Sequence, residues 1–429
     1  MNKTTLSLIA VIVCAAFTDG APKSLLGRFL SVASNDSVVV SQQGHIDILK
    51  NTRASMPFIG DAEIRVRNRA FDFGGQRYSL KLEPRGVGET KALRAYKRAQ
   101  IDYEETLHRY TLNELLLLRY VFFIDVLERK SLADGYGDLI PVYEDRIKVL
   151  EQLQNSTDFN LSDLIKEEKN LAKMISEKIE ESQEVSTANR YIWSIVGDSL
   201  SGGIDTVGLI SVDDIKKEFE KAVYTLDEDN IYLKNIREEF RFTEKRYDVE
   251  RTQNRKLISF FEFSFDFGSY NDEIMQEHRN KASDRNKAVI MEVGIKLPFV
   301  SGDREDVARR QIDFLHDREE SMKLREELAA KMKKDIADMK AYIARYEMLT
   351  ARETEADAEA SLKKYNQMSG VDPLALLEIR EALIKNRMEK EKMYFSILRN
   401  YIYIKDVTGE LINEPRTNYL SAQREALEQ

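Results

Sequence analysis

Strict alternation of apolar and polar residues predicts β-strands in four short segments. The clearest are residues 260–267 and 289–297, where every second residue is Phe, Val, Met, Ile or Leu. Alternation with a period of two places the two sets of side chains on opposite faces of a sheet. Residues 64–69 and 78–83 alternate in the same way, and a β-bulge or strand end near Asn68 would restore the phase that slips there.

A period of three to four residues takes over after each strand pair and predicts very long helices. No Pro or Gly interrupts the chain between Asp303 and Ser369. Apolar residues form one stripe along this segment, which indicates a rod that needs partner helices. At about 1.5 Å per residue, such a rod is roughly 100 Å long. The matching helix in the first half is expected to break between Ala133 and Pro141, where Gly135 and Gly137 stand.

The two halves are copies of one unit of strand, strand, long helix and returning helix. Phe71-Asp72-Phe73-Gly74 recurs as Phe265-Asp266-Phe267-Gly268, and Gln100-Ile101-Asp102-Tyr103 recurs as Gln311-Ile312-Asp313-Phe314. We assign the copies to residues 62–190 and 257–411. The predicted remainder is an irregular segment at 22–61, a connecting segment with a lead-in helix at 191–256, and a polar, disordered tail at 412–429.

Composition and the N-terminal residues indicate the class of protein and its export from the cytoplasm. Few Pro and Gly (7 and 19 of 429 residues) and 32% charged residues favour long helices. A net charge of −9 argues against a nucleic-acid partner. Lys3 followed by the apolar run Leu6–Phe17 predicts a signal peptide at residues 1–21. Cys14, the single cysteine, lies in this run and is either removed with it or lipidated. No later segment is apolar enough for a membrane helix, so any membrane embedding would use strands.

One motif resembles a known family. Val293-Gly294-Ile295-Lys296-Leu297-Pro298-Phe299 followed by Ser301-Gly302-Asp303-Arg304, together with Gly370–Glu378, is similar to the TolC-like outer-membrane factors. The resemblance implies a mainly α fold with β: antiparallel coiled-coil helices form a periplasmic tunnel, and four strands per protomer join a 12-stranded outer-membrane β-barrel of a homotrimer. It implies a passive conduit for efflux or type I secretion, with a periplasmic adaptor and an inner-membrane transporter as partners.

The resemblance also implies roles for particular residues. Acids just after each tip, Asp163 and Glu378, would narrow the pore, although exposed carboxylates at a helix start are also favoured by the helix dipole alone. The tips would dock the adaptor through Asp158, Phe159, Asn160, Leu161, Gly370, Val371, Asp372 and Pro373. If the apolar strand face meets outer-membrane lipid, the barrel lumen would be lined by Arg65, Arg67, Arg69, Lys81, Glu262, Asp266, Glu292 and Lys296.

Three departures from the family pattern keep alternatives open. The first copy has no evident lead-in helix, its rod carries the Gly/Pro break, and Lys166 and Ala375 stand where further acids are expected. These features favour a second hypothesis, a non-conducting structural protein of the envelope. The strands alone also fit a half-buried soluble sheet, although their Phe content disfavours a soluble periplasmic adaptor.

Catalytic and cofactor chemistry is not expected. The histidines His45, His108, His278 and His316 show no metal-ligand spacing. Gly86-Val87-Gly88 is a glycine pair in a strand-to-helix turn and does not match a phosphate-binding loop. We therefore predict neither an enzyme nor a bound cofactor or metal.

Overall fold

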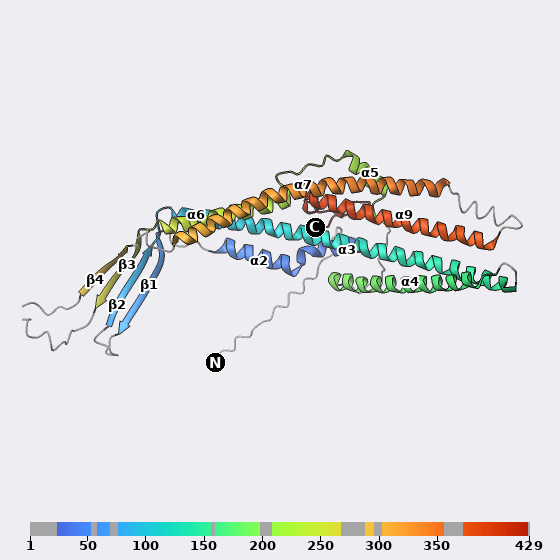
Figure 1. The fold of residues 1–429 in the computed structure, drawn as a ribbon. Coiled ribbons are helices and arrows are strands. Elements are labelled where there is room, and N and C mark those ends of the chain that lie inside the picture. Colours follow the sequence, from blue (N-terminus) through green and yellow to red (C-terminus); the bar gives the residue numbers. More distant parts are fainter. Residues whose placement is uncertain are drawn as a thin grey trace, which may run out of the picture. The chain divides into compact units, whose positions relative to one another are not determined.

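The computed structural model describes residues 24–52, 58–68, 76–155, 159–197, 208–266, 288–295, 303–355 and 372–427. The predicted signal peptide, including Cys14, lies outside these ranges. Figure 1 labels the helices and strands of the chain. The chain divides into two units. One comprises residues 1–39, 111–227 and 328–429, and the other comprises residues 40–110 and 228–327. None of the described helices is both long enough and apolar enough to cross a membrane.

A four-stranded antiparallel sheet is the first part of the unit 40–110/228–327. Its strands are β1 (Ile59–Asn68), β2 (Gln76–Pro84), β3 (Ile258–Asp266) and β4 (Ala288–Ile295), in the order β1-β2-β3-β4. The four predicted strands are therefore confirmed. The β2–β3 pairing joins the two sequence copies, because Leu80 lies opposite Phe263.

Helices of the same unit continue from the sheet. They are most of α2 (Ser37–Asn51), α6 (Ile231–Asn254) and the first parts of α3 (Glu89–Gln152) and α7 (Asp303–Glu355). Aromatic contacts join them: Tyr103 stacks on Phe242 with ring centroids 5.5 Å apart, and Phe240 lies 4.7 Å from Phe314. Helix α3 thus packs on α6, and α6 packs on α7.

The other unit holds the remainder of α3 and α7 with α1 (Leu25–Ser31), α4 (Leu161–Val196), α5 (Val212–Lys221) and α9 (Pro373–Val407). Its core is an apolar stripe from these helices, as the 3.6-residue period predicts. The largest fully buried side chains include Leu116, Tyr120, Ile124, Leu127, Met339 and Ile192.

The expectation of an irregular segment at residues 22–61 is wrong for most of its length, since α1 and α2 occupy it. The Ser24 side chain caps α1 by accepting a hydrogen bond from the Gly27 N–H at 2.9 Å. The β-branched run at residues 38–40 is helical because packing outweighs local propensity, with Val39 and Ile46 both buried. The first copy therefore has a lead-in helix, shorter than α6.

The expected break in α3 is also wrong. The helix is continuous from Glu89 to Gln152, with Pro141 inside it. A Cβ atom on Gly135 would lie 2.6 Å from Cγ of Met388 on α9, and one on Gly137 would lie 3.2 Å from Nζ of Lys178 on α4. A side chain at Gly135 would therefore displace the Met388 side chain, whereas the flexible end of Lys178 can move away from Gly137.

The predicted disorder of the tail is wrong up to Leu427. Leu420 has 0% exposure, and Leu209 and Ser421 form an antiparallel bridge. The Tyr120 hydroxyl accepts a hydrogen bond from the Tyr419 N–H at 3.1 Å and donates one to the Thr417 carbonyl at 3.2 Å. Polar composition misled here, because a few buried anchors are enough to hold such a segment.

Candidate functional site

The two faces of the sheet have opposite chemistry. Ile64, Leu80, Phe263 and Met291 lie opposite one another across the four strands, while the adjacent row is Glu63, Lys81, Glu262 and Glu292. Residues paired in this way share a face. The next apolar row is Val66, Tyr78, Phe265 and Val289. The polar row beside it is Arg65, Ser79 and Ser264, and it ends on β4 at Ile290, an apolar exception.

The apolar face is the more open of the two. On the two central strands, Leu80 and Phe263 of the apolar face are 38% and 42% exposed, whereas Ser79 and Ser264 of the polar face are 7% and 3% exposed. A half-buried soluble sheet has the reverse arrangement, with apolar side chains against a core and polar ones in water. Exposed apolar area of this kind marks a surface that contacts lipid or another apolar partner.

Several charges on the polar face are paired with one another. Arg65 Nη2 lies 2.6 Å from Glu63 Oε2, and Arg65 Nη1 lies 4.0 Å from Glu262 Oε2 on β3. Arg77 donates to Ser264 Oγ at 3.0 Å, and Lys81 lies 2.8 Å from Glu83. The structure therefore brings most of the predicted lumen residues to one face: Arg65, Arg67, Lys81, Glu262 and Glu292. Asp266 pairs with Arg77 in the register, while Arg69 and Lys296 lie outside the described residues.

The predicted constriction acids lie on two different helices. Asp163 is in the first turn of α4 and Glu378 is in the second turn of α9, and both side chains are exposed. Within the described part of the chain no ion pair joins either acid to another residue. Their role as a constriction therefore stays a prediction.

The helix starts at the predicted tips are capped by tip residues. The Asn160 side chain accepts from the Ser162 N–H, and Asp372 accepts from the Leu374 N–H, each at 3.0 Å. Pro373 occupies the first turn of α9, where its missing N–H costs nothing. Of the remaining predicted tip residues, Phe159 is half-buried and Leu161 is exposed, while Asp158, Gly370 and Val371 lie outside the described residues.

Arg146 joins three helices near these tips. It extends from α3, with Nη1 3.1 Å from Glu167 Oε2 on α4 and Nη2 2.7 Å from Glu381 Oε2 on α9. The Tyr143 hydroxyl donates to Glu381 at 2.7 Å, and Lys385 lies 2.5 Å from the same carboxylate. We call Tyr143, Arg146, Glu167, Glu381 and Lys385 the Arg146 network.

Electrostatics hold Glu381 in its charged form. Burial disfavours the carboxylate, but hydrogen bonds from Lys385, Tyr143 and Arg146 outweigh this and lower its pKa to about 2. Sequence reasoning missed the Arg146 network. The sequence did contain one indication of this network. Arg146 interrupts an apolar stripe whose buried residues are Leu139, Val142, Tyr143 and Leu150. A charge in such a stripe requires a buried partner.

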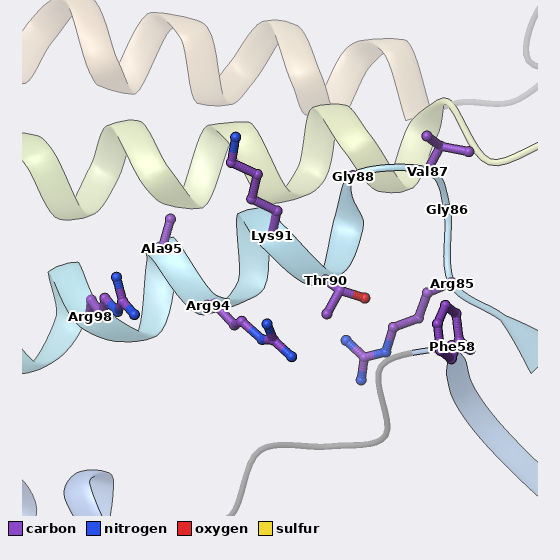
Figure 2. A pocket seen from close by; sticks show the side chains of 10 residues that line it. All are labelled: Phe58, Arg85, Gly86, Val87, Gly88, Thr90, Lys91, Arg94, Ala95 and Arg98. Atoms are coloured by element: carbon purple, nitrogen blue, oxygen red, sulfur yellow. The ribbon is translucent and has the colours of Figure 1, made fainter.

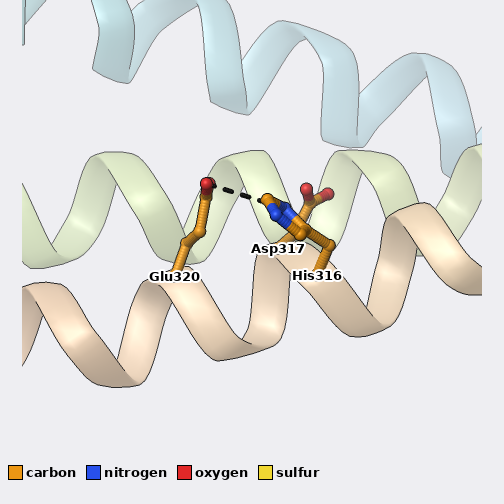
Figure 3. Close-up of side chains that lie close together, drawn as sticks. All are labelled: His316, Asp317 and Glu320. Carbon is orange, nitrogen blue, oxygen red and sulfur yellow. Dashed lines mark ion pairs between the residues drawn. The ribbon is translucent and has the colours of Figure 1, made fainter.

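One turn of α7 differs from the expectation that no histidine has metal-ligand spacing. The ligand atoms of His316, Asp317 and Glu320 lie within 4.8 Å of one another (Figure 3). His316 Nδ1 is 3.6 Å from Glu320 Oε1, and both side chains are exposed. This is the ordinary geometry of an i,i+4 pair on a helix surface.

Comparisons with known proteins find similarity in the fold and none in the sequence searches. Searches of protein-family models and of curated proteins find no match to this chain. Among solved structures, the outer membrane protein VceC from Vibrio cholerae superimposes with a TM-score of 0.62 at 11% identity, covering 90% of this chain and 96% of VceC. The open state of the MtrE outer membrane channel of Neisseria gonorrhoeae gives 0.63 at 9% identity, covering 94% and 91%. The CmeC outer membrane channel of Campylobacter jejuni gives 0.61 at 10% identity, covering 93% and 86%.

These similarities extend over nearly the whole of both chains, so the chain has the fold of the TolC-like outer-membrane channels. It is mainly helical, with four strands arranged as the sequence resemblance implied. At such low identity the likeness concerns the fold alone.

Proposed function

We propose that this protein is the outer-membrane channel of a tripartite efflux or type I secretion system. The observation that supports this proposal most directly is the division of the sheet into two faces. One face is apolar and exposed, and the other is polar and carries paired charges. In a membrane the apolar face meets lipid and the charged face lines a water-filled lumen, which is the alternation found in transmembrane barrels. Strands of 8 to 10 residues suit this purpose, because a tilted strand of about 9–11 residues spans a bilayer.

The proposed assembly is a homotrimer. The β1-β2-β3-β4 order leaves β1 and β4 as edges of the sheet. Unpaired backbone groups at such edges are not tolerated in hydrocarbon, so a membrane sheet must close. Three copies, each contributing four strands, close a 12-stranded barrel, with β1 of one copy pairing with β4 of the next.

The helices form the proposed periplasmic tunnel, which a partner opens from its tips. The hairpin of α3 and α4 is held to α9 by Arg146, so widening the tip requires this network to break. Asp163 and Glu378 each become a ring of three acids under three-fold symmetry and narrow the pore there. The tip residues from Asp158 to Leu161 and from Gly370 to Pro373 dock a periplasmic adaptor, which connects the channel to an inner-membrane transporter.

Two of the three departures that favoured the non-conducting structural alternative do not occur, because α1 and α2 supply a lead-in and α3 is continuous. The third, Lys166 and Ala375 in place of further acids, still favours it. The proposal assigns the chain no enzymatic activity and no cofactor.

Cell fractionation tests the proposal. We expect the protein in the outer membrane, resistant to extraction with alkaline carbonate, and migrating with the mass of a trimer after mild solubilisation. Recovery in the soluble periplasm would contradict both the barrel and the channel.

A further inference from the structure

A cavity lies at the helical end of the sheet, where β1 begins and β2 ends. Its volume is about 710 Å³, and it is lined by the first turns of α3 together with the residues that flank the two strands (Figure 2). The Arg85 N–H donates to the Phe58 carbonyl at 3.0 Å, and the Arg85 side chain donates to the Ile59 carbonyl at 3.4 Å. These bonds fix one wall of the cavity against the start of β1.

The lining of this cavity is strongly basic. Among the described residues, the lining includes Arg85, Lys91, Arg94 and Arg98 and no acidic residue. The nearest acid in sequence, Glu89, is buried and accepts the Gly86 N–H at 2.6 Å. Figure 2 shows the guanidinium groups of Arg85 and Arg94 reaching toward the same space.

Two of these cations have no partner within the described chain. Neither Arg94 nor Arg98 has a carboxylate at ion-pairing distance among the described residues. Farther along α3, Arg129 pairs with Glu181 and Arg146 pairs with Glu381. Arg94 and Arg98 lie one turn apart and share a helix face. Adjacent unpaired guanidinium groups around an acid-free cavity suit an anionic ligand.

The position of the cavity indicates which anion it receives. It begins where the apolar face of the sheet ends, and two apolar residues flank it: Phe58 is 81% exposed and Val87 is fully exposed. Aromatic and basic residues beside an apolar band are typical of the boundary between hydrocarbon and lipid headgroups. A soluble phosphate compound has no apolar part that would contact Phe58 and Val87.

We infer that this cavity binds the phosphate of an anionic lipid headgroup in the leaflet nearest the helices, an inference that rests on the proposed membrane location. Guanidinium groups bind phosphate oxygens in pairs of parallel hydrogen bonds. Arg94 and Arg98 supply these donors, and Phe58 and Val87 contact the glycerol and upper acyl carbons. The bound lipid fixes the depth at which the barrel sits.

The test uses the full-length protein purified in a neutral detergent. Short-chain phosphatidylglycerol, short-chain phosphatidylcholine and inorganic phosphate are titrated separately, and binding is followed by native mass spectrometry. The variant is Arg94→Gln with Arg98→Gln. The control is Lys169→Gln with Lys173→Gln, which removes two exposed cations at the same spacing on α4. We expect phosphatidylglycerol to bind the wild type more tightly than phosphatidylcholine, and the Arg94/Arg98 variant to lose about tenfold or more in affinity while the control is unchanged.

Three results would overturn the inference. One is equal binding of the two lipids, which removes the role of the headgroup charge. Another is equal loss in the variant and the control, which removes the role of this cavity. The third is inorganic phosphate binding as tightly as phosphatidylglycerol, which makes the site one for a free anion. Cell fractionation of the wild type and the variants is a separate measurement, which tests the membrane location independently of lipid binding. An outer-membrane protein without lipid preference defeats only this inference, whereas a soluble wild type defeats the proposed function.

Discussion

Arg146 and Glu381 form an ion pair, with Nη2 and Oε2 2.7 Å apart, that connects α3 to α9. Both side chains are mostly buried, and each has a second partner: Glu167 for Arg146 and Lys385 for Glu381. A charge pair removed from water is costly to break, because either partner left alone is a buried, uncompensated charge. The pair is therefore suited to hold the helices together until an external force separates them.

The first prediction concerns the stability of this pair. Arg146→Gln should lower the free energy of unfolding by about 3 kcal/mol, and Glu381→Gln should have a similar effect. The double variant should cost clearly less than the two single changes together, because either single change already removes the Arg146–Glu381 contact. Chemical unfolding followed by circular dichroism measures all three. If the losses in free energy of unfolding of the two single variants simply add up in the double variant, the proposed coupling between Arg146 and Glu381 is wrong.

The second prediction concerns pH. The pKa of Glu381 is lowered to about 2 in the folded protein, so its unfolded form takes up a proton first as the pH falls. The stabilisation is complete above the ordinary glutamate value of about 4.3 and is lost progressively down to pH 2. Between these limits the wild type should lose more stability than Glu381→Gln, which has no such proton to gain. Parallel pH dependences would contradict the assignment.

The third prediction tests the two faces of the sheet by labelling. In a Cys14→Ser background, Met291→Cys and Glu292→Cys place single cysteines at neighbouring positions of β4. In membranes a water-soluble thiol reagent should label Cys at position 292 quickly and at position 291 slowly, because only the polar face is wet. A lipid-soluble reagent should reverse the order. Equal labelling by the water-soluble reagent would contradict the lipid-facing assignment.

The fourth prediction concerns the close approach at Gly135. Gly135→Val places side-chain atoms against Met388 and should lower the free energy of unfolding by about 1–3 kcal/mol. Gly44→Ala is the control, because a Cβ atom there meets nothing within 4 Å, and it should stabilise α2 by about 0.5–1 kcal/mol. Thermal unfolding compares the two. A neutral Gly135→Val would mean that the Met388 side chain moves aside without a cost in stability.

The strands and the long helices could be predicted from the sequence because each has one strong period. Alternation over residues 260–266 and 289–295 fixes which side chains share a face, and the register confirms those faces. The two glycines in α3 misled because a residue without a side chain signals a break and a close contact equally well. The run at residues 38–40 misled because the local preference of valine is weaker than the burial of Val39.

The candidate site was less predictable for a different reason. The residues of the proposed lumen face lie on one sheet, and the alternation of polar and apolar residues along each strand predicts which of them share that face. The Arg146 network depends on α4 and α9 reaching the same point on α3 from separate sequence copies, which no local pattern specifies. The roles of Asp163 and Glu378 depend on the symmetry axis of an assembly, so one chain leaves them as predictions.

Single-channel recording tests the central claim most directly. Purified trimer is inserted into planar lipid bilayers, and the wild type is compared with Arg146→Gln. The account predicts discrete conductance steps, with larger or longer openings in Arg146→Gln because the hairpin of α3 and α4 is released from α9. A folded, membrane-inserted trimer that conducts in neither form would contradict the claim that this protein is a channel.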